Sequence, residues 1–170
     1  MHVTIPAVVL TLILGLAVQA RAEMPKSEVD FIATIQDART VYEAQETKAK
    51  KTALVNEMVK RWKAILPDGK IHDWVGKIVE LGKTKGGRIH VAIRIADKIN
   101  LMTWEKPFLD FSHGTLIGPK SELYPILSAM KRGDTVRFDG KYQSFVNLNE
   151  RAKLYDTDLI VAFSAIAPGS

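Results

Sequence analysis

Cysteine is absent from all 170 residues of the sequence. This absence excludes disulfide bonds as a source of stability, and it removes the thiolate ligands that complete many zinc sites. The folded chain must therefore be held together by its hydrophobic core, which a chain of this length can supply. The composition, with 46% hydrophobic and 25% charged residues, is that of a globular protein.

Long apolar runs are also scarce, and the one that is present lies at the start of the chain. Val8–Val18 is apolar and is followed by Ala20-Arg21-Ala22, the small-x-small pattern that signal peptidase accepts. The run is short for a membrane span, which needs about 20 residues. We therefore expect residues 1–22 to be a cleaved signal peptide, with an uncleaved anchor as the alternative. This segment predicts export to a bacterial periplasm, without a membrane span after cleavage.

The spacings typical of catalytic and metal sites are missing as well. His72, His90 and His113 form neither H-x-x-x-H nor H-E-x-x-H, although His72 and His90 could approach each other across a hairpin. Ser112 beside His113 has no G-x-S-x-G context, and Gly82–Arg88 lacks the spacing of a phosphate-binding loop. Four aspartates are interpreted as turn or strand-end caps: Asp134, Asp139, Asp156 and Asp158. The sequence therefore predicts no enzyme, no metal and no cofactor.

A helical pattern is present between residues 27 and 66. Apolar residues recur there at helical spacing, whereas Gln45–Thr52 is mostly polar. One long helix and two helices with a break near Thr47 are both compatible with this pattern. Ser27, with Asp30 three residues later, predicts a capping box at the helix start.

A series of short β patterns follows the turn at residues 67–69. We expect five strands and one helix between the third and fourth strands, at residues 72–81, 88–96, 99–104, 122–132 (the helix), 134–142 and 159–167. Residues 115–117 and 147–158 could add a short strand and a local helix. Gly76 predicts a bulge or sharp coil that would let the first strand serve both sides of a small barrel.

Three strands, a helix and two strands is the layout of the OB-fold, a five-stranded Greek-key barrel. Trp74–Ile78 matches its bent first strand, and Arg132–Gly140 contains G-D-x-V followed by a β pair and a glycine. On these residues the chain resembles exported bacterial OB-fold proteins with an N-terminal helical extension. The resemblance implies a mainly β fold with α, in which an OB-fold barrel at residues 69–170 follows a helical extension at 23–68. It implies no biochemical activity.

The usual ligand surface of an OB-fold lies over strands two and three, between the loops that join strands one to two and four to five. In this sequence the surface and its loops would present Lys83, Lys85, Arg88, His90, Arg94, Trp104, Tyr142, Arg151 and Lys153. We therefore expect a non-enzymatic periplasmic module that binds an envelope protein or a glycan. Single-stranded nucleic acid is the alternative ligand. It binds to basic grooves with aromatic side chains on which bases stack, and this surface has the basic residues but few exposed aromatics. A second copy of the chain is a further candidate partner, which would form a homodimer through the helical extension.

Overall fold

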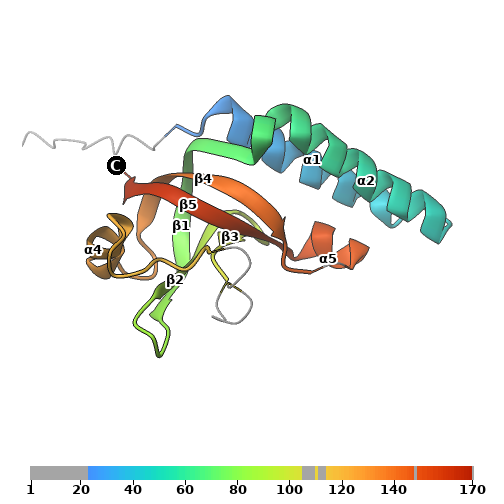
Figure 1. Cartoon of the computed structure of the whole chain (residues 1–170). Helices are drawn as coiled ribbons and strands as arrows, with labels where there is room; N and C mark the ends of the chain where they lie inside the picture. Colours follow the sequence, from blue (N-terminus) through green and yellow to red (C-terminus); the bar gives the residue numbers. More distant parts are fainter. Residues whose placement is uncertain (1–22, 105–109, 111–113, 148, 170) are drawn as a thin grey trace, which may run out of the picture.

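The computed structural model describes residues 23–104, 110, 114–147 and 149–169, and Figure 1 shows the path of the chain. In chain order the elements are α1 (Lys26–Tyr42), α2 (Lys48–Ile65), η1 (Pro67–Gly69), β1 (Lys70–Lys83), β2 (Ile89–Ala96), β3 (Ile99–Met102), α4 (Leu123–Ser128), β4 (Thr135–Phe145), α5 (Glu150–Tyr155) and β5 (Thr157–Pro168). The predicted signal peptide at residues 1–22 lies outside the described residues, and so do Ser112 and His113.

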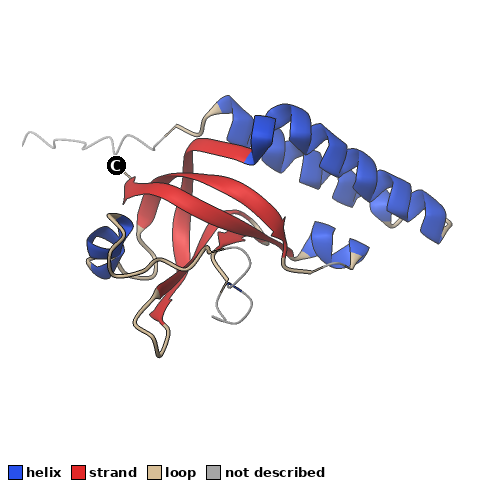
Figure 2. Ribbon diagram, viewed as in Figure 1, coloured by secondary structure: helices blue, strands red, loops and turns tan. Residues whose placement is uncertain are grey.

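The strands form a closed barrel in the order β1-β2-β3-β5-β4. All neighbouring strands are antiparallel except β3 and β5, which run parallel. Figure 2 shows the barrel with the α1–α2 hairpin along one side and α4 away from that hairpin. The predicted five-stranded barrel with a preceding helical extension is therefore confirmed, including the helix between the third and fourth strands.

The first strand does serve both sides of the barrel, as its sequence predicts. Its first half pairs with β4 and its second half pairs with β2. The register shifts lie between Ile71 and Trp74 and between Ile78 and Glu80, so the irregularities flank Gly76 instead of falling on it. Gly76 instead permits close approach, because a Cβ there would lie 2.4 Å from Ile93 Cγ2.

Several predicted boundaries differ from the structure. The helix expected at 122–132 is shorter in the structure, where α4 ends at Ser128. The amides of Ala129 and Met130 bond to carbonyls three residues earlier, and the chain then turns. Gly133 follows with φ +98°, a conformation that favours glycine. Residues 115–117 contribute a single bridge between Ile117 and Ile89, and the local helix expected near residue 150 is α5.

Of the two alternatives for the helical extension, the structure has two helices with a break before Thr47, which caps α2 by accepting the amide of Lys50 at 3.2 Å. The capping box at Ser27 is wrong. Helix α1 begins at Lys26 directly after Pro25, so Ser27 lies inside the helix. Its hydroxyl instead accepts the indole N–H of Trp74 on β1, at 3.0 Å.

An aromatic cluster joins the helices to the barrel. The ring of Phe31 on α1 lies 4.5 Å from Trp62 on α2 and 5.1 Å from Trp74 on β1, measured between ring centroids. Trp62 also packs on Phe145 of β4 at 5.3 Å. The buried side chains of both helices belong to the same hydrophobic cluster as those of the strands. The helical extension therefore packs on its own barrel, and the two share one core.

Glu28 is a buried carboxyl at this junction. Its Oε2 accepts the amide of Val75 on β1 at 2.9 Å, and its Oε1 has no hydrogen-bond partner among the described residues. Burial raises the pKa of Glu28 from its usual 4.5 to about 7, against the opposing effects of the Val75 amide and the nearby Arg137. The folded protein therefore holds this proton at pH values where the unfolded chain has released it.

This difference predicts a pH-dependent stability. Between pH 4.5 and about 7 the folded state binds more protons than the unfolded state, so the free energy of unfolding should fall as the pH rises through that window. Glu28→Gln keeps an acceptor for Val75 and removes the titration. We expect urea denaturation of this variant to lose that part of the pH dependence and to give a higher midpoint above pH 7. The exposed control Glu122→Gln should behave like the parent. If the free energy of unfolding changed with pH equally in Glu28→Gln and in the parent, Glu28 would not be the titrating group.

The close approach at Gly76 yields a second prediction. Gly76→Ala forces a methyl group against Ile93 and the carbonyl of Arg94, so overpacking should destabilise the barrel by about 1–3 kcal/mol. Gly86, in the β1–β2 turn, has only the Thr84 hydroxyl within 4 Å of its added Cβ, at 3.8 Å. Gly86→Ala should therefore change stability by less than about 0.5 kcal/mol in the same thermal melt. Similar losses in the two variants would show that contact with β2 is not what requires glycine at position 76.

Candidate ligand-binding surfaces

A row of polar side chains crosses the outside of the barrel over four strands. Lys77 of β1 is in register with Arg94 of β2, Arg94 with Asn100 of β3, and Asn100 with Asp158 of β5. Arg94 Nε donates to Asn100 Oδ1 at 3.1 Å, and Asn100 Nδ2 donates to Asp158 Oδ1 at 2.7 Å. We call these four residues the polar row.

The polar row is open to solvent, whereas the neighbouring row on the same face is partly closed. Lys77 and Arg94 are exposed, and Asn100 and Asp158 are half-buried. In the next row along the strands, Ala92 is 3% exposed and Ile160 is 0% exposed. The face over strands two and three therefore offers polar contacts to a ligand at the polar row. The side chains of the next row, Ala92 and Ile160, are buried and offer none.

Four of the residues predicted to bind ligand gather at the β1–β2 hairpin. Lys83 Nζ lies 4.9 Å from the ring centroid of Tyr124, and His90 Nδ1 lies 3.4 Å from Glu80 Oε1. Lys85 is exposed in the turn. This group is separated from the polar row by several residues along β2.

Arg88, the fourth member of the hairpin group, has a structural partner. Its Nη1 lies 3.3 Å from Asp110 Oδ2, and Asp110 is only 1% exposed. The other oxygen of Asp110 accepts the amides of Thr115 and Leu116 and the hydroxyl of Thr115. Arg88 thus neutralises a buried carboxylate that fixes the start of the 114–117 segment.

Arg151 and Lys153 lie on α5, which is turned toward the helical hairpin. Arg151 Nη2 is 3.2 Å from Glu43 Oε1, and Lys153 Nζ lies 5.2 Å from the ring centroid of Phe145. Arg39 of α1 donates to the carbonyl of Leu154, which ties α5 to the helix. The loop between strands four and five is therefore committed to the helices and does not join the polar row.

The two aromatic residues of the predicted ligand set, Tyr142 and Trp104, are half-buried. Tyr142 packs edge-on against Trp62 at 6.4 Å, and burial raises the pKa of its hydroxyl. Trp104 follows β3, and its backbone amide donates to the hydroxyl of Thr115 at 2.9 Å. The nine predicted residues are thus divided among the hairpin, the polar row, α5, the Trp62 side of β4 and the segment that follows β3.

The expected approach of His72 and His90 is wrong. His90 is paired with Gly82 near the end of β1, whereas His72 lies near its beginning, with Nδ1 3.1 Å from Asp139 Oδ1 on β4. Within the described residues no group of three or more His, Cys, Asp or Glu side chains could hold a metal ion.

Sequence reasoning missed three members of the polar row. Asn100 stands between the buried residues Ile99 and Leu101, an alternation that marks it as outward-facing. Asp158 was expected to cap a turn or a strand end, as Asp134 does by accepting the amide of Lys131 in the turn before β4, but it accepts the side chain of Asn100. Only the pairing of the strands brings these positions together, because they are 58 residues apart.

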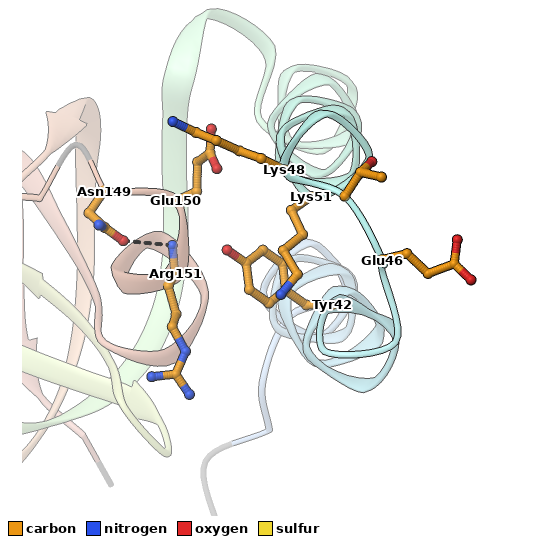
Figure 3. A pocket seen from close by; sticks show the side chains of 8 residues that line it. Tyr42, Glu46, Lys48, Lys51, Asn149, Glu150 and Arg151 are labelled. Carbon is orange, nitrogen blue, oxygen red and sulfur yellow. Dashed lines mark hydrogen bonds between the residues drawn. The ribbon is translucent and has the colours of Figure 1, made fainter.

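A hollow of about 560 Å³ opens between the α1–α2 turn and α5 (Figure 3). Lys48, Lys51 and Arg151 line it together with Glu46 and Glu150, so cations and carboxylates are nearly balanced. Lys51 Nζ lies 4.8 Å from the Tyr42 ring centroid, and Glu150 Oε1 accepts the hydroxyl of Thr52 at 2.6 Å. These contacts tie α2 to α1 and to α5, so the residues around the hollow hold the three helices together.

Across the described residues, no helix is both long and apolar enough to cross a membrane. No protein-family model matches the chain, and a search of the curated proteins finds no similar sequence.

Proposed function

We propose that this chain is an exported, non-enzymatic binding module that recognises a protein or a glycan of the bacterial envelope through the outer barrel face. The polar row is the observation that carries the proposal. Its side chains stand on neighbouring strands, and hydrogen bonds link Arg94 to Asn100 and Asn100 to Asp158, so Arg94 and Asn100 are held in place before a ligand arrives. Preorganisation of this kind reduces the entropy lost on binding.

The chemistry of the polar row suits a ligand with both donors and acceptors. Lys77 and Arg94 offer donors, and the carboxylate of Asp158 offers an acceptor. Sugar hydroxyls and exposed peptide groups present the same mixture. The cations of the hairpin, Lys83 and Lys85, would extend the surface along β1 and β2.

A single-stranded nucleic acid fits this surface less well. Asp158 places a negative charge where a phosphate backbone would lie, and stacking platforms are needed beside the cations. Tyr142 packs edge-on against Trp62 of α2, and its neighbour on β5 is Val161 and not Asp158.

The test is a cross-linked capture from cells that express the full chain with a C-terminal tag. The parent should recover one envelope protein, identified by mass spectrometry, or bind envelope glycans on an array. Arg94→Ala with Asn100→Ala should reduce capture by roughly tenfold or more, because a preorganised hydrogen-bonding pair is lost. Both residues lie on the surface, so the circular dichroism spectrum and thermal midpoint should remain close to those of the parent.

The matched control is Asn56→Ala with Arg61→Ala, which removes the same two residue types from the exposed side of α2. This control should capture the same partner as the parent. If only the control variant lost the partner, the binding site would lie on the helices and not on the barrel face, and the proposal would be overturned. Capture of single strands, with an affinity that falls steeply as salt rises, would favour nucleic acid instead.

A further inference from the structure

The positive charge of this protein is concentrated on one helix. Helix α2 carries six basic side chains and one acidic side chain, a net charge of +5 that equals the formal charge of the whole chain. The rest of the sequence is therefore neutral in sum. This asymmetry is independent of the polar row.

The basic residues of α2 are not explained by the stability of the helix. Lys48, Lys50 and Lys51 occupy its first turn, which contains no acidic residue. Cations at a helix N-terminus oppose the helix dipole, so their position there is unfavourable for folding. Lys50 and Lys51 are partly compensated by Glu46, at 3.3 Å, and Glu43, at 3.7 Å.

Three lysines of α2 remain without an ion-pair partner in the part of the chain that the structure describes: Lys48, Lys60 and Lys63. All three are exposed. At 3.6 residues per turn they project within about 120° of one another. The single acidic residue of α2, Glu57, is directed to Arg61 at 3.7 Å.

Two further lysines adjoin the C-terminal end of α2. After η1 the chain enters β1 at Lys70, which is in register with Lys141 of β4, and both are exposed. Like charges directly opposite on neighbouring strands repel. We call Lys48, Lys60, Lys63, Lys70 and Lys141 the basic surface. Carboxylates also lie close to the basic surface, because Glu46, Glu57, Asp68 and Asp139 are each within three residues of one of its lysines in the chain. Glu46 and Glu150 line the same hollow as Lys48.

We propose that the basic surface docks this protein on an anionic phospholipid membrane. Lysine is depleted at protein–protein interfaces, whose dominant contacts come from Trp, Tyr and Arg, so a surface built from lysine fits a protein partner poorly. Clustered lysines are the usual means of adsorbing to anionic lipid. Helix α2 exposes alanines between its charges, at Ala49, Ala53 and Ala64, and none of the exposed residues of α2 is a large apolar side chain that would insert. Docking is therefore electrostatic and reversible.

The test is co-sedimentation of the protein, purified in the form that cells export, with vesicles of phosphatidylglycerol and phosphatidylcholine. Binding is expected to the mixed vesicles and not to pure phosphatidylcholine. It should disappear as salt rises from about 0.01 M to about 1 M, because the screening length falls from about 30 Å to about 3 Å. Lys48→Gln, Lys60→Gln and Lys63→Gln together should weaken partitioning roughly tenfold or more.

The charge-matched control replaces Lys98, Lys120 and Lys131 with Gln, three exposed lysines outside the basic surface. It should bind vesicles nearly as the parent does. Equal weakening by the two triple variants, or unchanged binding of the α2 variant, would overturn the proposal. Retention on polyglutamate without binding to vesicles would assign an acidic protein as the partner and overturn it as well. The α2 variant keeps Arg94 and Asn100, so its envelope capture reports on the proposed function separately.

Discussion

The packing of Phe31 against Trp62 and Trp74 is the contact on which the architecture depends. These three rings come from α1, α2 and β1, so a single aromatic cluster unites the helical hairpin with the barrel. With no disulfide available, burial of such large apolar surfaces is the main source of stability. The polar contacts around it, from Ser27 to Trp74 and from Glu28 to Val75, then fix the angle and register at which α1 meets the first strand.

The same docking divides the outside of the protein into two surfaces. The helices occupy the side of the barrel that contains Tyr142, and they draw α5 toward themselves through Arg39 and Tyr155. The polar row on β1, β2, β3 and β5 is left as the open barrel face. Charge follows this division, because the excess of cations belongs to α2 and the polar row combines both signs. A module that adsorbs through one surface and recognises its partner through another is consistent with both proposals.

Local pattern was sufficient for the order of the strands and the barrel, because alternation in the strands is visible in sequence, whereas it left one helix or two open before the barrel. It was insufficient for the site, because register decides which side chains are neighbours. Arg94 was expected on the ligand face, but Asn100 and Asp158 are brought to it only by the pairing of β3 with β2 and β5. The capping prediction at Ser27 failed for the same reason, because its hydroxyl accepts a hydrogen bond from Trp74 of β1 and does not cap the helix.

The contact between α1 and α5 has a consequence for how the chain folds. Arg39 bonds to the carbonyl of Leu154, 115 residues later, and β5 pairs with both β3 and β4 to close the barrel. The first helix therefore lacks part of its packing surface until nearly the whole chain is available. Contacts between such distant residues slow folding, because loop-closure entropy is paid before they form. Complete packing of α1 and closure of the barrel are therefore expected only after most of the chain has been synthesised.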